Sequence, residues 1–129
     1  SLNLALRTRR FRSEVFRAPL DPDTQARELL VDLVRAQGER SLICVLRRAF
    51  AHPGQRATLD ALLRITPDVL VVCAREPFDA AFAGRARHVA CTYGDDEASV
   101  EALADAIAGR LEPVGRLPVT LNTGFSAAR

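Results

Sequence analysis

Polar residues able to do chemistry are concentrated in three segments, each directly after an apolar run. These segments are residues 47–52, 75–79 and 93–97. If the apolar runs are parallel strands, all three segments meet at the carboxyl edge of one sheet, where α/β proteins bind their ligands. We therefore take this edge as the candidate site. The predicted contact residues on it are Arg47, Arg48, His52, Arg75 and Glu76.

Carboxylates near the same edge are the groups that a glycosidase would need. Hydrolysis of a glycosidic bond uses one acid and one nucleophile or base on either side of it. The candidates are Glu76, Asp79, Asp95 and Asp96. Each has a simpler interpretation as a helix cap or a surface charge, so we expect no catalytic residue in this chain. Sugar-stacking side chains are also scarce, because Trp is absent and only one Tyr is present.

Other kinds of site are poorly supported. Neither GxGxxG nor GxxxxGK[ST] occurs, and residues 94–97 place three carboxylates where a phosphate would have to lie. No G-x-S-x-G elbow is present. His88 and Cys91 are three residues apart on a strand, so their side chains point to opposite faces. We expect no cofactor and no metal, because the two His residues are not spaced for zinc.

Charge and cysteine usage limit the partners. The net charge of +2 is too small to indicate nucleic acid, and the Arg residues around Phe11 fit a solvated arm. No apolar run is long enough to span a membrane. The cysteines Cys44, Cys73 and Cys91 lie in apolar runs and form no CxxC pair, so we expect buried, reduced thiols. Free thiols favour a cytoplasmic location.

Apolar runs predict the strands. Residues 42–46 and 69–73 are unbroken runs, typical of strands buried on both faces in a parallel sheet. Weaker strands are expected at residues 13–18 and 88–93. A short final strand is expected at 118–121, where Pro118 suits an edge strand or the first position of a strand.

Helical spacing of apolar residues predicts helices over 22–37, 54–64 and 97–109, and a short one over 77–82. Asp21 is the expected N-cap of the first, with Pro22 at N1 and Gly38 just past its end. Alternation of strands and helices indicates an α/β fold, a three-layer α/β/α sandwich with a mainly parallel sheet of about five strands.

Three sequence segments, taken in order, resemble the C-terminal domain of glycoside hydrolase family 3, in its bacterial β-N-acetylhexosaminidase branch. Residues 51–55 read AHPGQ, like the family's "PGQ" helix start. Residues 74–79 read AREPFD, like its "R-x-P-[YF]-D" segment. Residues 92–94 and 113–119 read TYG and PVGRLPV, like the family's ending. The motif residues expected to be structural are Pro77, Asp79, Tyr93, Gly94, Gly115 and Pro118.

This resemblance implies a domain organisation. In the family, a (β/α)₈ barrel that carries the catalytic Asp nucleophile precedes this domain. A barrel of roughly 250 residues does not fit in 129 residues, so we expect it to lie outside this sequence. Residues 1–12 would be the connection from the barrel, 13–121 the family-3-like domain, and 122–129 a tail.

The resemblance also implies an accessory function. The domain would pack on the barrel and wall one side of the cleft that binds an N-acetylglucosamine-containing glycan. Alone it would be inactive, and its uncovered apolar patch would favour self-association. Two alternatives stay open: a β-glucosidase-type domain in which Glu76 or a neighbour supplies the general acid, and a non-enzymatic interaction module.

Overall fold

Helices and strands alternate along most of the chain, which confirms the α/β class. The computed structural model describes residues 2–11, 14–38, 41–66, 68–73, 86, 88–91, 97–110 and 119–123. The strands are β1 (Glu14–Ala18), β2 (Leu42–Leu46), β3 (Val69–Cys73), β4 (His88–Cys91) and β5 (Val119–Thr123). The helices are α1 (Leu2–Thr8), α2 (Thr24–Ala36), α3 (Pro53–Ile65) and α4 (Glu97–Arg110), with a 3₁₀ turn, η1 (Ala49–Ala51).

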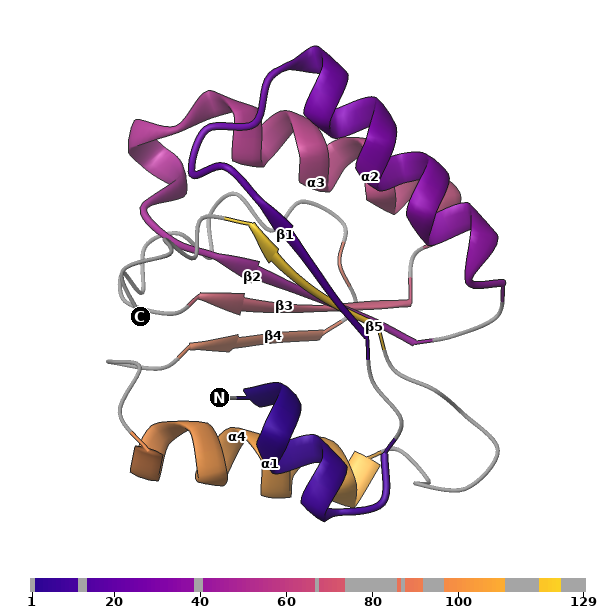
Figure 1. Cartoon of the computed structure of the whole chain (residues 1–129). Helices are drawn as coiled ribbons and strands as arrows, with labels where there is room; N and C mark the ends of the chain where they lie inside the picture. The colour runs from indigo at the N-terminus through magenta and orange to yellow at the C-terminus, as the bar shows by residue number, and fades with distance from the viewer. Residues whose placement is uncertain are drawn as a thin grey trace.

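The strands form one parallel sheet in the order β1-β5-β2-β3-β4 (Figure 1). β2 and β3 pair from Leu42 opposite Val69 to Leu46 opposite Cys73. Because the strands are parallel, their carboxyl ends share one edge of the sheet. The loops that follow β1 and β2 therefore leave from the same side.

β5 is not an edge strand, which excludes one of the two positions that Pro118 suggested. β5 lies between β1 and β2 and pairs with both, so the two ends of the sheet are β1 and β4. Pro118, which was expected at an edge, lies outside the described residues. The strand that follows it begins at Val119, opposite both Glu14 and Leu42. A proline just before an interior strand costs no ladder hydrogen bond, so the edge assignment did not follow from its presence.

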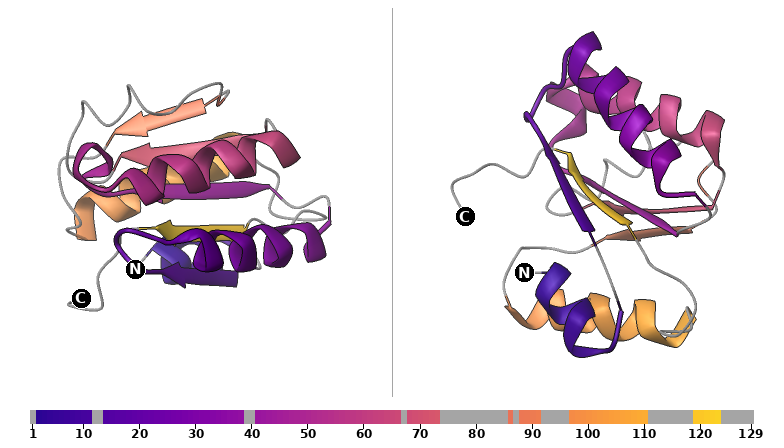
Figure 2. Two further views of the ribbon diagram at one scale, coloured as in Figure 1. Left: turned by 90° about the horizontal axis from the view of Figure 1, so that it is seen from above. Right: turned by 45° about the vertical axis from the view of Figure 1, so that its right-hand side comes forward.

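Both faces of the sheet are covered, and side chains alternate between the two. On the α2 and α3 face, Leu42, Cys44 and Leu46 of β2 pack with Leu59 and Leu62 of α3. Seen from above, α2 runs along the β1 end of the sheet, and α3 runs beside it over β2 and β3 (Figure 2). The predicted burial of Cys44 and Cys73 is confirmed, and neither forms a disulfide.

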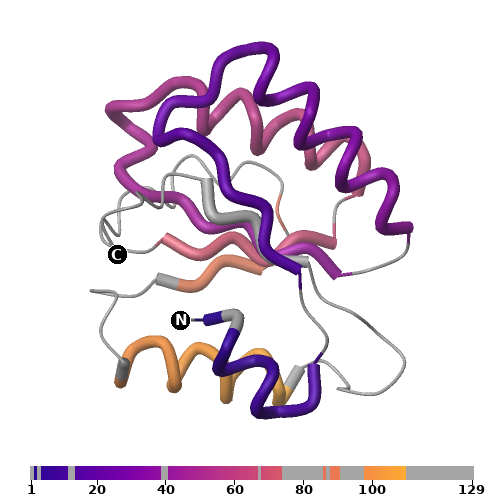
Figure 3. Tube along the Cα trace, viewed as in Figure 1, coloured from indigo at the N-terminus to yellow at the C-terminus, as the bar shows by residue number. Residues whose placement is uncertain are grey.

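The opposite face carries α1 and α4. Ile43 and Val45 of β2 point to this side and pack with Leu103, Ala104 and Ile107 of α4. The two helices lie side by side beneath the sheet (Figure 3). Continuous apolar strands are thus explained, because successive side chains enter two separate cores.

Residues 2–11 differ from the solvated arm that was expected. Residues 2–8 form α1, and Leu6 and Phe11 are almost fully buried in the core beside α4. Arg9 completes the contact, with its guanidinium 2.8 Å from Glu101 and 2.9 Å from Asp105. The hydrogen bond that Arg9 donates to the Asp105 carboxylate raises the pKa of the Arg9 side chain, and Glu101 acts in the same direction. This segment is therefore part of the packed domain.

Helix ends follow the sequence with one correction. The N-cap of α2 is Asp23 and not Asp21, which was predicted. The Asp23 side chain accepts a hydrogen bond from the Ala26 amide at 2.8 Å. Gly38 lies just past the helix with φ of +70°, as expected. Pro53 stands in the first turn of α3. Asp21 instead accepts a hydrogen bond from the first turn of α3.

Candidate docking edge at the carboxyl ends of β1 and β2

Two loops meet at the carboxyl edge of the sheet. One follows β1 and spans residues 19–23; the other follows β2 and spans residues 47–52, including η1. Both contact the first turn of α3, which begins directly after the second loop. The first turn of α3 is therefore hydrogen bonded to both loops.

Gln55 clamps the two loops together from inside. Its side chain is fully buried. Its Oε1 accepts a 3.0 Å hydrogen bond from the Arg47 amide, and its Nε2 donates to the Arg47 carbonyl at 2.8 Å. The same Nε2 donates to the Leu20 carbonyl at 2.7 Å. One amide side chain thus pairs with two backbone groups where β2 ends and with one in the loop after β1, which fixes the start of the β2 loop.

A second connection runs through Gly54. Its amide donates a 2.7 Å hydrogen bond to the Asp21 carboxylate, so Asp21 supplies an acceptor to the N-terminal turn of α3. A Cβ atom on Gly54 would overlap the Pro22 carbonyl and stand 2.6 Å from the Asp21 Oδ1. Only glycine allows this close approach of the two loops. The carboxylate also occupies the place where an external anion would bind that helix end.

Residues at the tip of the β2 loop point outward. Arg48 is exposed and has a left-handed backbone, with φ of 54° and ψ of 46°. That conformation costs a residue other than glycine roughly 1–2 kcal/mol. Phe50 is 42% exposed, and its ring centroid lies 5.7 Å from the Arg48 Cζ. A cation and an aromatic ring are thereby presented together.

Arg56 holds the tip from behind. Its Nη1 donates hydrogen bonds to the carbonyls of Ala49, at 2.6 Å, and Phe50, at 3.2 Å. This guanidinium is committed to the loop backbone, whereas that of Arg48 lies on the outside. The stretch from residue 40 to residue 59 contains four Arg and no Asp or Glu. The loop therefore presents positive charge.

The predicted contact residues of this loop have different environments. Arg48 is on the surface, as expected, and His52 is half-buried between η1 and α3. Arg47 is only 7% exposed, so it is a buried part of the loop and not a contact residue of the outer surface. Its backbone amide and carbonyl are both hydrogen bonded to Gln55.

Other predicted residues lie outside the described part of the chain. They are Arg75, Glu76, Pro77, Asp79, Tyr93, Gly94, Gly115 and Pro118. The same holds for Asp95, Asp96 and the short helix expected at 77–82.

Sequence reasoning missed the residues that build the edge. Gln55 and Asp21 were not expected to join the two loops, and Phe50 was not expected beside Arg48. The signal that could have found Gln55 is the PGQ motif itself. The motif's glycine is required by the close contact with Pro22, and its glutamine forms hydrogen bonds with three backbone groups.

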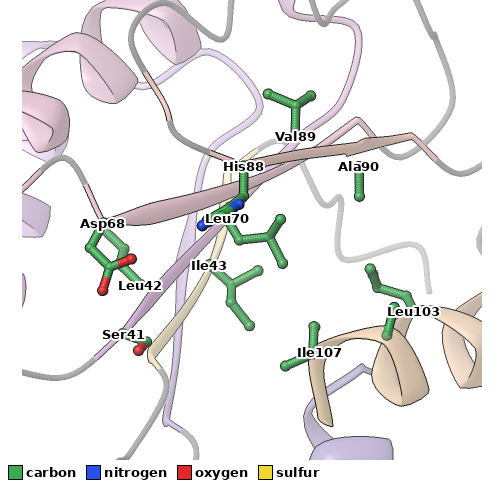
Figure 4. A pocket seen from close by; sticks show the side chains of 11 residues that line it. Ser41, Leu42, Ile43, Asp68, Leu70, His88, Val89, Ala90, Leu103 and Ile107 are labelled. Carbon is green, nitrogen blue, oxygen red and sulfur yellow. The ribbon is translucent and has the colours of Figure 1, made fainter. Parts of the chain in front are cut away.

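A separate hollow lies at the opposite, amino edge of the sheet, between β2–β4 and α4 (Figure 4). Its volume is about 470 Å³. Mostly apolar side chains line it, with Ser41, Asp68 and His88 on the side of the strand starts. It offers one carboxylate among the described residues, whereas glycoside hydrolysis by the two-carboxylate route needs a pair.

Two further kinds of feature are absent from the described ranges. No group of three or more His, Cys, Asp or Glu side chains there could hold a metal ion. None of the helices described is long and apolar enough to cross a membrane.

Comparison with protein-family models, with curated proteins and with solved structures finds no match for this chain.

Proposed function

We propose that this domain is a non-catalytic accessory domain of a glycoside hydrolase similar to the β-N-acetylhexosaminidases of family 3. It packs on a catalytic (β/α)₈ barrel and walls one side of the cleft that binds an N-acetylglucosamine-containing glycan. The barrel supplies the chemistry, and this domain supplies shape and contacts.

Agreement between two independent lines supports the proposal. The three motif segments suggest the family, and the observed α/β fold with a parallel sheet is of the class that the family uses. The finer architecture that we propose is a three-layer α/β/α sandwich around a mainly parallel sheet of about five strands. Helices on both faces and the pairing from β1 to β4 are consistent with it.

The observation that carries the proposal is the structural role of the PGQ motif. Pro53 starts α3, Gly54 permits the contact with the β1 loop, and Gln55 clamps the end of β2. Together they present a rigid loop bearing Arg48 and Phe50 at the carboxyl edge. Rigid loops on such an edge are where α/β domains meet ligands and partners.

The test is hydrolysis of a chromogenic aryl N-acetyl-β-glucosaminide. We expect the full-length protein that carries this domain to hydrolyse it and the 129-residue chain alone to be inactive. Activity of the chain alone would overturn the assignment of chemistry to the barrel. Inactivity of the full-length protein on this substrate and on aryl β-glucosides would reject the glycosidase function.

The same assay tests the β-glucosidase-type alternative. If Glu76 were the general acid, Glu76→Ala in the full-length protein would abolish turnover of substrates with poor leaving groups. Substrates whose leaving group needs no proton would still react. Our proposal expects no such difference between the two kinds of substrate.

A further inference from the structure

We infer that the exposed pair Arg48 and Phe50 is the docking contact of this domain, and that the surface it meets on the catalytic barrel is acidic. This inference rests on the proposed function and deepens it, because it names the chemistry of the partner surface.

Rigidity of the loop backbone is the first argument. The loop is anchored at Arg47 by Gln55 and at Ala49 and Phe50 by Arg56. Little backbone freedom remains to be lost when a partner binds, and preorganised loops bind more tightly for that reason.

Exposure of the two side chains is the second argument. Phe50 is among the four large apolar residues found exposed in the described part of the chain, and of these it is the aromatic one. Its ring is in contact with the guanidinium of Arg48. Arg and aromatic side chains are the residues that most often dominate the energy of a protein interface.

Charge selects the partner. The charged residues from residue 40 to residue 59 are all basic. The guanidinium of Arg56 donates hydrogen bonds to carbonyls of the loop. The neighbouring carboxylate of Asp21 is hydrogen bonded to the Gly54 amide. The outward cation is therefore Arg48, and a surface rich in Asp or Glu complements it.

The experiment uses the full-length protein with the substitutions Arg48→Glu, Arg48→Gln, Arg48→Lys and Phe50→Ala. The matched control is Arg64→Glu, an exposed Arg in the last turn of α3, at the opposite edge of the sheet. Two quantities are measured: kcat/KM on the aryl N-acetyl-β-glucosaminide, and the radius of gyration by small-angle X-ray scattering.

We expect Arg48→Glu to lower kcat/KM about tenfold and to increase the radius of gyration as the domains separate. Arg48→Gln and Phe50→Ala should lie between this variant and the wild type. Arg48→Lys should stay close to the wild type, because the charge is retained. Raising the salt concentration should lower kcat/KM of the wild type toward the value of the Arg48→Gln variant, because salt screens the attraction between the two surfaces.

Several outcomes would overturn the inference while leaving the proposed function intact. One is an active wild type whose Arg48→Glu variant is unchanged in both measurements. Another is an equal loss in Arg64→Glu. A loss in Arg48→Lys as large as in Arg48→Glu would reject an acidic partner surface. An inactive wild type would instead reject the proposed function.

Discussion

The Asp21 carboxylate accepts a 2.7 Å hydrogen bond from the Gly54 amide and so joins the loop after β1 to the first turn of α3, although the two residues are 33 positions apart in the chain. Since Asp21 is the acceptor for an otherwise unpaired helix-end amide, it acts as a cap supplied from another element. We expect Asp21→Ala to lower the free energy of unfolding by about 1 kcal/mol, as for loss of a side-chain cap. Urea denaturation measures the change. Asp32→Ala, on an exposed position of α2, is the control, and an equal effect there would show that the contact contributes nothing.

Gly54 should tolerate no side chain. A Cβ atom there would overlap the Pro22 carbonyl, so the two loops must move apart. We expect Gly54→Ala to lower the free energy of unfolding by about 3 kcal/mol. Gly109→Ala in α4 is the matched control, because nothing lies within 4 Å of its added Cβ. That control should raise stability by about 0.5 kcal/mol, since alanine favours helix. Equal effects in thermal melting would contradict the close contact.

Gln55 should be needed for stability, although it is polar. Gln55→Leu leaves the Arg47 amide, the Arg47 carbonyl and the Leu20 carbonyl without this partner in a buried place. The expected loss is about 3 kcal/mol. Gln25→Leu, at an exposed position of α2, serves as the control and should change stability by less than about 0.5 kcal/mol. A Gln55→Leu variant as stable as the wild type by urea titration would argue against the clamp.

Leu6 and Leu4 separate the buried and exposed sides of α1. Leu6 is fully buried, whereas Leu4 is 63% exposed. We expect Leu6→Ala to lower the free energy of unfolding by about 3 kcal/mol and Leu4→Ala to change it by less than about 0.5 kcal/mol. Chemical denaturation distinguishes the two. If Leu6→Ala were as mild as Leu4→Ala, α1 would not be part of the folded core.

Glycine at position 48 should make the protein more stable than Arg48 does. Its left-handed backbone is unfavourable for an arginine and costs glycine nothing extra. We expect Arg48→Gly to raise the free energy of unfolding by about 1 kcal/mol while lowering the activity of the full-length protein. Gly38→Ala is the reverse control, because Gly38 also has positive φ and should lose about 1 kcal/mol. An Arg48→Gly variant that is both more stable and fully active would show that the side chain has no docking role.

Strands β2 and β3 were predicted with their observed ends because each is an uninterrupted apolar run. Helices with regular apolar spacing were predicted within two residues at each end. Such elements can be predicted because their buried positions form a local pattern of apolar residues in the sequence. The choice between Asp21 and Asp23 as the cap of α2 was not accessible, since both precede the helix and only the fold shows that Asp21 faces Gly54.

The missed features depend on contacts between distant parts of the chain. α1 has only seven residues and would be marginal alone, so its stability comes from α4 and the sheet. The place of β5 between β1 and β2 is set by pairing, which no local pattern encodes. At the candidate site, Arg48 and His52 were predicted from their position after a strand, and their role as contact residues stays a prediction. Gln55 was not, because a polar residue in the first turn of a helix usually faces water.

The insertion of β5 between β1 and β2 constrains the order in which the protein can be assembled. Among the described strands β1 is made first, yet its strand neighbour, residues 119–123, is the last of them to be made. β2, β3 and β4 can associate as soon as they are made, whereas β1 has no hydrogen-bonded neighbour in the sheet until residues 119–123 are present. The final strand then enters a slot that is already bounded on both sides. Completion of the sheet therefore depends on pairings between strands that are distant in the chain, and pairings of high contact order form slowly.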